Sequence, residues 1–96
     1  MTTQKVIKCF LNKQKASTPV RDIPNGYWTY RGASIHTDGR VLYSYTTPIA
    51  YWWTNDIIKA TSHKYSQTTS KQQSTLKWEA YQNDVQLIET PDEITL

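Results

Sequence analysis

Cysteine and glycine are scarce in this chain of 96 residues, which holds one cysteine, Cys9, and three glycines. A single cysteine excludes an intramolecular disulfide and is typical of a reducing compartment, so we expect a cytoplasmic protein. The glycines do not cluster, which excludes a phosphate-binding glycine loop. Lys5 and Lys8 interrupt the N-terminal apolar stretch, which is too short for a signal peptide or membrane span. We expect no membrane association.

Groupings of catalytic or metal-binding residues are also lacking. Cys9, His36 and His63 are scattered along the chain, and neither a nucleophile elbow nor a catalytic cysteine signature is present. The sequence therefore predicts a protein that is not an enzyme and that holds no metal or cofactor. Function is expected to rest on binding.

Acidic residues are rare before position 79. Residues 1–78 contain all eleven Lys and Arg but three acids, a net charge of +8, whereas residues 79–96 contain five acids and no Lys or Arg. The basic part favours contact with a polyanion, and the acidic end could compete for the same surface.

The length allows one domain, which we place at residues 1–90, followed by an acidic tail at 91–96. Apolar and β-branched runs predict strands at residues 5–11, 27–30, 33–36, 40–45, 49–53 and 57–60. Residues 12–25 read as a loop, and Asp38-Gly39 predicts a β-hairpin with a type I′ turn. Alternation predicts that Val41, Tyr43 and Tyr45 form one row facing a second row of Ile49, Tyr51 and Trp53.

A helix is expected over residues 70–82, because Thr69-Ser70-Lys71-Gln72 has the form of a capping box and apolar residues follow at helical spacing. Its apolar stripe is narrow, so one side should remain in water, and a last strand is expected at 85–88. The predicted fold class is α+β: a small antiparallel β-meander sheet with one C-terminal-half helix packed on it.

Two sequence blocks carry a resemblance. Residues 44–50 read SYTTPIA, and residues 65–71 read YSQTTSK. This pair resembles a motif pair in small uncharacterised proteins of bacteriophages and other mobile elements, over roughly residues 35–78, although Gln72 stands where that family usually has His. The resemblance implies a viral or mobile-element origin, with the host cytoplasm as the location, and no particular activity.

Three segments are candidate binding sites. The strand Tyr51-Trp52-Trp53 places aromatics on both sheet faces. One face could be an exposed platform for a base or a partner protein, or the helix and its Trp78 could cover these aromatics. The helix start could hold a phosphate, or its hydroxyls could merely cap the helix. N-terminal lysines could contact phosphates or protect a sheet edge. The candidate residues are Tyr51, Trp52, Trp53, Lys64, Tyr65, Thr68, Thr69, Lys71, Lys8, Lys13 and Lys15.

Two functions follow from these segments. The first is an accessory protein that binds nucleic acid or a nucleotide phosphate through its basic residues and a stacking aromatic. The alternative is an inhibitor or adaptor that docks on a host protein, such as a defence complex of the kind that anti-CRISPR proteins block or a nuclease complex, with aromatics as the hot spot. Open β edges and surplus aromatics also favour a homodimer.

Overall fold

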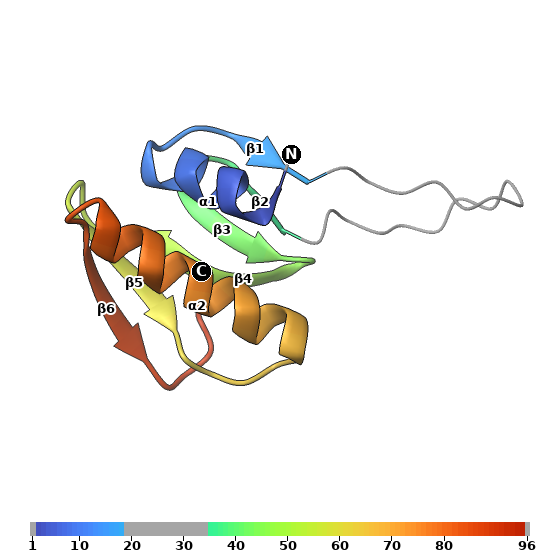
Figure 1. Ribbon diagram of the computed structural model, residues 1–96. Helices are drawn as coiled ribbons and strands as arrows, with labels where there is room; N and C mark the ends of the chain where they lie inside the picture. Colours follow the sequence, from blue (N-terminus) through green and yellow to red (C-terminus); the bar gives the residue numbers. More distant parts are fainter. Residues whose placement is uncertain (1, 19–34, 96) are drawn as a thin grey trace, which may run out of the picture.

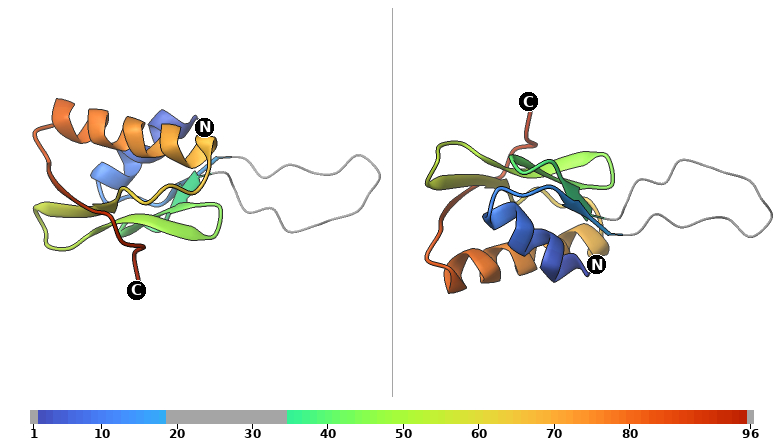
Figure 2. Two further views of the ribbon diagram at one scale, coloured as in Figure 1. Left: turned by 90° about the horizontal axis from the view of Figure 1, so that it is seen from below. Right: turned by 90° about the horizontal axis from the view of Figure 1, so that it is seen from above.

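The computed structural model describes residues 2–18 and 35–95, in which two helices lie on one face of a six-stranded sheet (Figure 1, Figure 2). The α+β class, the meander and the helix in the C-terminal half are confirmed. The strands expected within residues 27–34 lie outside the described residues. In chain order the elements are α1 (Thr3–Leu11), β1 (Ala16–Ser17), β2 (Ile35–Thr37), β3 (Val41–Ser44), β4 (Thr47–Trp52), β5 (Ile57–Thr61), α2 (Gln67–Gln82) and β6 (Gln86–Thr90).

The strands lie side by side in the order in which they occur in the chain. Neighbours from β1 to β5 pair antiparallel, as in a meander. The chain then crosses over through α2, so β6 pairs parallel to β5 at the sheet edge. Such a parallel pair requires a long connection, which α2 supplies. The predicted last strand is thereby confirmed as an edge strand, and α2 packs across the sheet.

The segment expected as a strand at residues 5–11 is a helix, so that prediction is wrong. Thr2 caps α1 by accepting a hydrogen bond from the backbone N–H of Lys5. Val6, Ile7 and Phe10 are all fully buried, a spacing that one helix face can satisfy and an alternating strand cannot. Packing of this face against the sheet outweighs the strand preference of the β-branched pair. The loop that follows includes the short strand β1.

The β2–β3 hairpin is confirmed, but its turn is not type I′. That turn needs two consecutive residues with positive φ, and of the turn residues 38–41 only Gly39, at +103°, has one. Side chains hold the turn instead: the Thr37 hydroxyl accepts from the Gly39 N–H, and Asp38 Oδ1 accepts from the N–H groups of Arg40 and Val41. These two backbone N–H groups lower the pKa of the Asp38 carboxyl below its ordinary value of 3.8.

The two predicted rows of side chains pair only in part, because a bulge shifts the register between β3 and β4. Val41 pairs with Tyr51, but Tyr43 pairs with Pro48, which leaves Ile49 as the extra residue. As a result Ile49 and Ala50 are both buried, although they are adjacent in sequence. Tyr45, with a φ of 56°, lies beyond β3 in the following turn and does not continue its row.

The helix α2 begins three residues earlier than predicted. Its N-cap is Ser66, whose hydroxyl accepts from the Thr69 N–H, so the proposed capping box from Thr69 to Gln72 is wrong. The predicted end at Gln82 is confirmed. An asparagine caps the C-terminus of each helix, and the next residue has a positive φ: Lys13 at 58° after α1 and Asp84 at 57° after α2.

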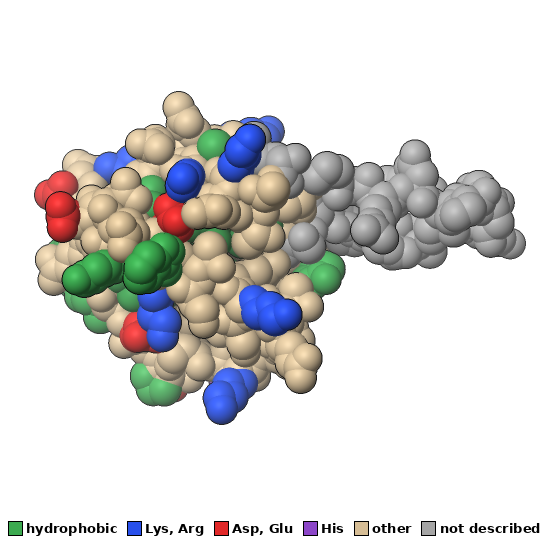
Figure 3. Space-filling view, viewed as in Figure 1, with side chains coloured by type: hydrophobic (Ala, Val, Ile, Leu, Met, Phe, Trp, Pro, Cys, Tyr) green, Lys and Arg blue, Asp and Glu red, His purple; other side chains and the backbone are tan. Residues whose placement is uncertain are grey.

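Aliphatic side chains from both helices and the sheet make up most of the core. Among the described residues, the buried aromatic side chains of this core are Phe10 and Trp52. Other aromatic side chains remain at the surface: Trp53 is 50% exposed, Trp78 59% and Tyr81 75%. The space-filling view shows hydrophobic side chains gathered over the end of α2 (Figure 3). Trp78 therefore does not supply the cover over the Tyr51–Trp53 aromatics that one of the two alternatives required.

Candidate functional site

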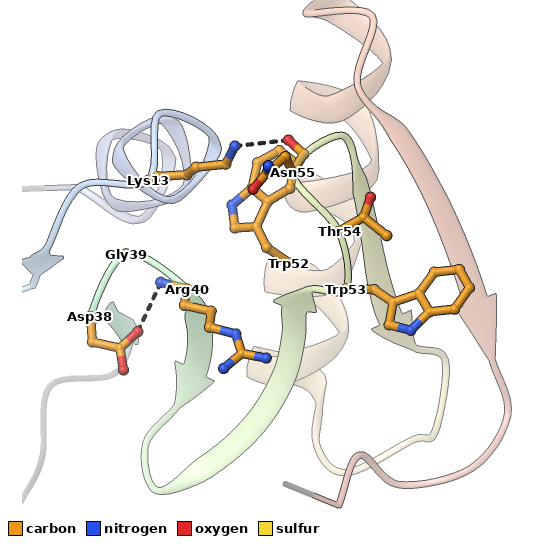
Figure 4. Close-up of a pocket in the computed structure, with 8 residues that line it drawn as sticks. All are labelled: Lys13, Asp38, Gly39, Arg40, Trp52, Trp53, Thr54 and Asn55. Carbon is orange, nitrogen blue, oxygen red and sulfur yellow. Dashed lines mark hydrogen bonds between the residues drawn. The ribbon is translucent and has the colours of Figure 1, made fainter.

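Three turns meet at one end of the sheet around an open hollow of about 680 Å³, which we call the turn hollow (Figure 4). They are the turns α1–β1, β2–β3 and β4–β5. The last two lie at the same end because every second turn of an antiparallel meander returns to that end. The residues that line the hollow are Lys13, Asp38, Gly39, Arg40, Trp52, Trp53, Thr54 and Asn55.

Lys13 joins the first of these turns to the third. Its backbone N–H donates to Phe10 O at 3.0 Å. Lys13 itself has a positive φ, and the helical conformation of α1 ends before it. Its Nζ donates to Asn55 O at 2.8 Å and lies 4.6 Å from the centroid of the Trp52 ring. Gly39 brings the second turn close, since a Cβ there would lie 2.8 Å from the carbonyl oxygen of Lys13. The three turns therefore form one connected structure.

Two consecutive tryptophans, Trp52 at the end of β4 and Trp53 immediately after it, have different environments. Trp52 is buried on the helix side, where its indole Nε1 donates to Phe10 O at 2.9 Å and its ring packs against the Phe10 ring. Trp53 is half exposed, and Lys59 Nζ lies 4.1 Å from its ring centroid. Of the three predicted platform residues, Tyr51, Trp52 and Trp53, only Trp53 is exposed.

Positive charge dominates the turn hollow. Lys13 and Arg40 line it, and Lys59 adds a third cation at Trp53. Among the described residues of the lining, Asp38 is the one acid, and its Oδ1 accepts from backbone N–H groups of its own turn. An open hollow with cations and an exposed indole can contact an anionic group and a planar ring together.

The predicted site at the start of α2 lies at the opposite end of the fold (Figure 1). The Thr69 hydroxyl is buried and contacts the hydroxyls of Ser44 and Ser66, so it packs α2 against the sheet. Tyr65 is half-buried, and burial, followed by the charge of Glu93, raises the pKa of its hydroxyl. The other three candidate side chains at this end are exposed: Lys64, Thr68 and Lys71.

The remaining predicted residues are spread over other surfaces. Tyr51 is half-buried and pairs with Lys59, which places it on the helix-free side of the sheet. Lys8 is exposed on α1, and Lys15 is exposed immediately before β1. The structure thus brings Lys13, Trp52 and Trp53 together and separates them from the other candidates.

Arg40 and Asn55 belong to the turn hollow and were not among the candidates. Both follow turn signals in the sequence, Asp38-Gly39 and Thr54, but no sequence pattern indicates that the two turns meet. In residues 2–18 and 35–95, no three His, Cys, Asp or Glu side chains gather where a metal ion could be held. No described helix is both long enough and apolar enough to cross a membrane.

These features define a small α+β protein with an aromatic and cationic hollow at one end of its sheet. The chain matches the Family of unknown function (DUF8033) over residues 24–85, more than half of its length, and it belongs to that family. No curated protein and no solved structure matches it. The matched range includes Arg40 and Trp53, whereas Lys13 and α1 lie outside it.

Proposed function

We propose that this protein is an accessory protein of a bacteriophage or mobile element that binds single-stranded nucleic acid at the turn hollow. The observation that carries the proposal is that the half-exposed Trp53 and the exposed Arg40 line the same hollow, in which the one acid among the described lining residues, Asp38, is engaged by its own turn. Arg40 and Lys13 would contact phosphates, and a base would stack on Trp53.

A single strand suits this geometry better than a duplex. Unpaired bases expose ring faces that can stack on an aromatic side chain, whereas duplex bases are stacked on one another. Reading a DNA major groove requires a helix or a β-ribbon that enters it. The turn hollow instead presents turns and one open indole.

The strength of the contact can be estimated from its parts. Base stacking on an aromatic side chain contributes about 1–3 kcal/mol per base by alanine substitution, so Trp53→Ala should weaken binding roughly 5- to 150-fold. Two phosphate contacts on a single strand predict a salt slope of about −1.4, which is a roughly sevenfold loss of affinity between 50 and 200 mM salt. Arg40→Gln should halve that slope to about −0.7.

Fluorescence anisotropy with an end-labelled oligothymidine tests these values at both salt concentrations. Trp78→Ala is the matched control for Trp53→Ala, since both tryptophans are exposed but on different surfaces. Lys71→Gln is the control for Arg40→Gln, because Lys71 is exposed at the opposite end of the fold. The absence of binding by the wild type at 50 mM salt, or equal losses in variants and controls, would refute the proposal.

A further inference from the structure

The outward side of α2 carries large aromatics where a solvated helix face is ordinarily polar. Trp78 is 59% exposed and Tyr81 75% exposed, and their rings lie side by side with centroids 6.4 Å apart and planes inclined by 29°. The buried side of the same helix uses Thr69, Gln72, Leu76, Glu79 and Ala80. Trp and Tyr are the residue types most enriched among the binding hot spots of protein interfaces.

Trp78 stands between two hollows where α1 runs beside α2. The hollow near the start of α1, of about 700 Å³, is lined by uncharged polar residues in addition to Trp78: Thr2, Thr3, Gln4, Ser74 and Thr75. The hollow near the end of α1, of about 580 Å³, includes Leu11, Val85 and Lys8 in its lining. A bound chain could therefore place side chains on both sides of one exposed indole.

The exposed charged side chains that α1 presents beside these hollows are lysines. Lys5 and Lys8 are exposed three residues apart on α1, which places them on the same helix face. Glu79, which lines the second hollow, is 3% exposed and accepts from Gln4 Nε2 at 2.8 Å. Lys77 is already paired with Glu89 at 3.5 Å. The two α1 lysines therefore favour an approaching surface that carries carboxylates.

We propose that the surface formed by Trp78, Tyr81, Lys5 and Lys8 docks an acidic segment of a partner protein that carries at least one apolar side chain. The apolar side chain would lie beside Trp78, over Leu11 or Val85, and the carboxylates would face the two lysines. A protein fits this surface better than a nucleic acid, because Lys8 is the one cation among the described residues that line the two hollows, whereas two cations line the turn hollow and phosphate binding grows with the number of cations.

A display selection tests this inference without knowledge of the natural partner. The probe is a random library of 12-residue peptides selected on the full chain. We expect enriched peptides to combine Asp or Glu with a large apolar residue and to bind Trp78→Ala about 30-fold more weakly, the size of a hot-spot truncation. A double variant, Lys5→Gln with Lys8→Gln, should weaken the same peptides and flatten their salt dependence.

Trp53→Ala is the matched control, because among the described residues it removes the second exposed tryptophan, on a different surface, and should leave peptide binding unchanged. Unchanged thermal unfolding of each variant would show that it is folded. The inference is overturned if no peptide family is enriched, if the enriched peptides are basic, or if they bind Trp78→Ala as well as wild type. It is also overturned if Trp78→Ala weakens oligothymidine binding more than Trp53→Ala does, since the surface would then serve nucleic acid.

Discussion

Replacing Gly39 with alanine should destabilise the protein and disturb the turn hollow together. Gly39 has a φ of +103°, and an added Cβ would lie 2.8 Å from the carbonyl oxygen and 3.2 Å from the carbonyl carbon of Lys13. Both atoms belong to the backbone, which two hydrogen bonds hold there: Lys13 N–H to Phe10 O and Gln14 N–H to Cys9 O. The new methyl group cannot be accommodated by a side-chain rotation.

The magnitude follows from three contributions. An alanine with positive φ costs about 1–2 kcal/mol. Crowding of a packed site typically costs a further 1–3 kcal/mol. Alanine also makes the unfolded chain less flexible than glycine does, which offsets about 0.4–1 kcal/mol of this destabilisation. With the middle value of each range, the free energy of unfolding should fall by roughly 3 kcal/mol, a large part of the stability of a domain of this size. Displacement of Lys13 should also weaken oligonucleotide binding. Its Nζ is held in the turn hollow by the hydrogen bond to Asn55 O, and without that bond it would no longer be positioned for its proposed phosphate contact.

Urea unfolding followed by circular dichroism measures the change. With a slope of about 1–2 kcal/mol per molar urea, the midpoint should move down by roughly 1–3 M. Arg40→Ala is the control in the same turn: Arg40 is exposed and lacks a positive φ, so its truncation should change stability by less than about 0.5 kcal/mol. A Gly39→Ala midpoint as close to wild type as that of Arg40→Ala would refute this account of the turn.

Two further predictions concern single residues elsewhere in the fold. Asp84→Gly should raise the free energy of unfolding by about 0.5–1 kcal/mol in the same urea assay, because Asp84 follows α2 with a φ of 57° that glycine adopts without strain; an unchanged or lower midpoint would contradict it. Asp38→Asn tests the acidic turn: the lowered pKa of Asp38 means that its carboxylate stabilises the fold above its ordinary pKa of 3.8 and ceases to do so as the pH falls through the lower folded value. The stability difference between wild type and Asp38→Asn should thus be constant above about pH 5 and shrink on acidification, and a difference that grows as the pH falls would contradict the assignment.

The sheet could be read from the sequence because its signals are local. Asp38-Gly39 lies between two runs of strand-forming residues, and pairing of β2 with β3 follows within ten residues of chain. The turn type could not be read, since it depends on bonds from the Thr37 hydroxyl and the Asp38 carboxylate rather than on the Asp-Gly pair alone. The bulge at Ile49 was equally hidden, because register is decided by packing across the sheet.

The helix α1 was missed although signals for it are present. Val6, Ile7 and Phe10 have helical spacing, Thr2 is a suitable N-cap, and Asn12 ends the helix by donating from its side chain to Lys8 O. The short length and the β-branched pair favoured a strand instead. What decides between the two is the presence of a sheet for the apolar face to cover, and a local pattern does not contain that information.

The candidate site was predicted in its residue types but not in its position. Trp53 and Lys13 lie 40 residues apart in the sequence, and the contact between Lys13 and Asn55 forms only because α1 is a helix that ends beside the β4–β5 turn. With residues 5–11 taken as a strand, no argument from the sequence could bring these residues together. Arg40 was overlooked for the same reason.

The exposed tryptophans show where an argument from domain size fails. A short domain has a small core to which large aromatics can contribute much burial, yet the described core depends on aliphatic residues with Phe10 and Trp52. Trp53 and Trp78 therefore add little burial, and stability alone gives no reason for a large indole at either position. The two rings lie on different surfaces, one beside cations in an open hollow and the other between two hollows along α1. Because the two surfaces differ in chemistry, two ligands account for them better than one. A nucleic acid at the turn hollow and an acidic protein segment beside Trp78 could therefore be bound at the same time.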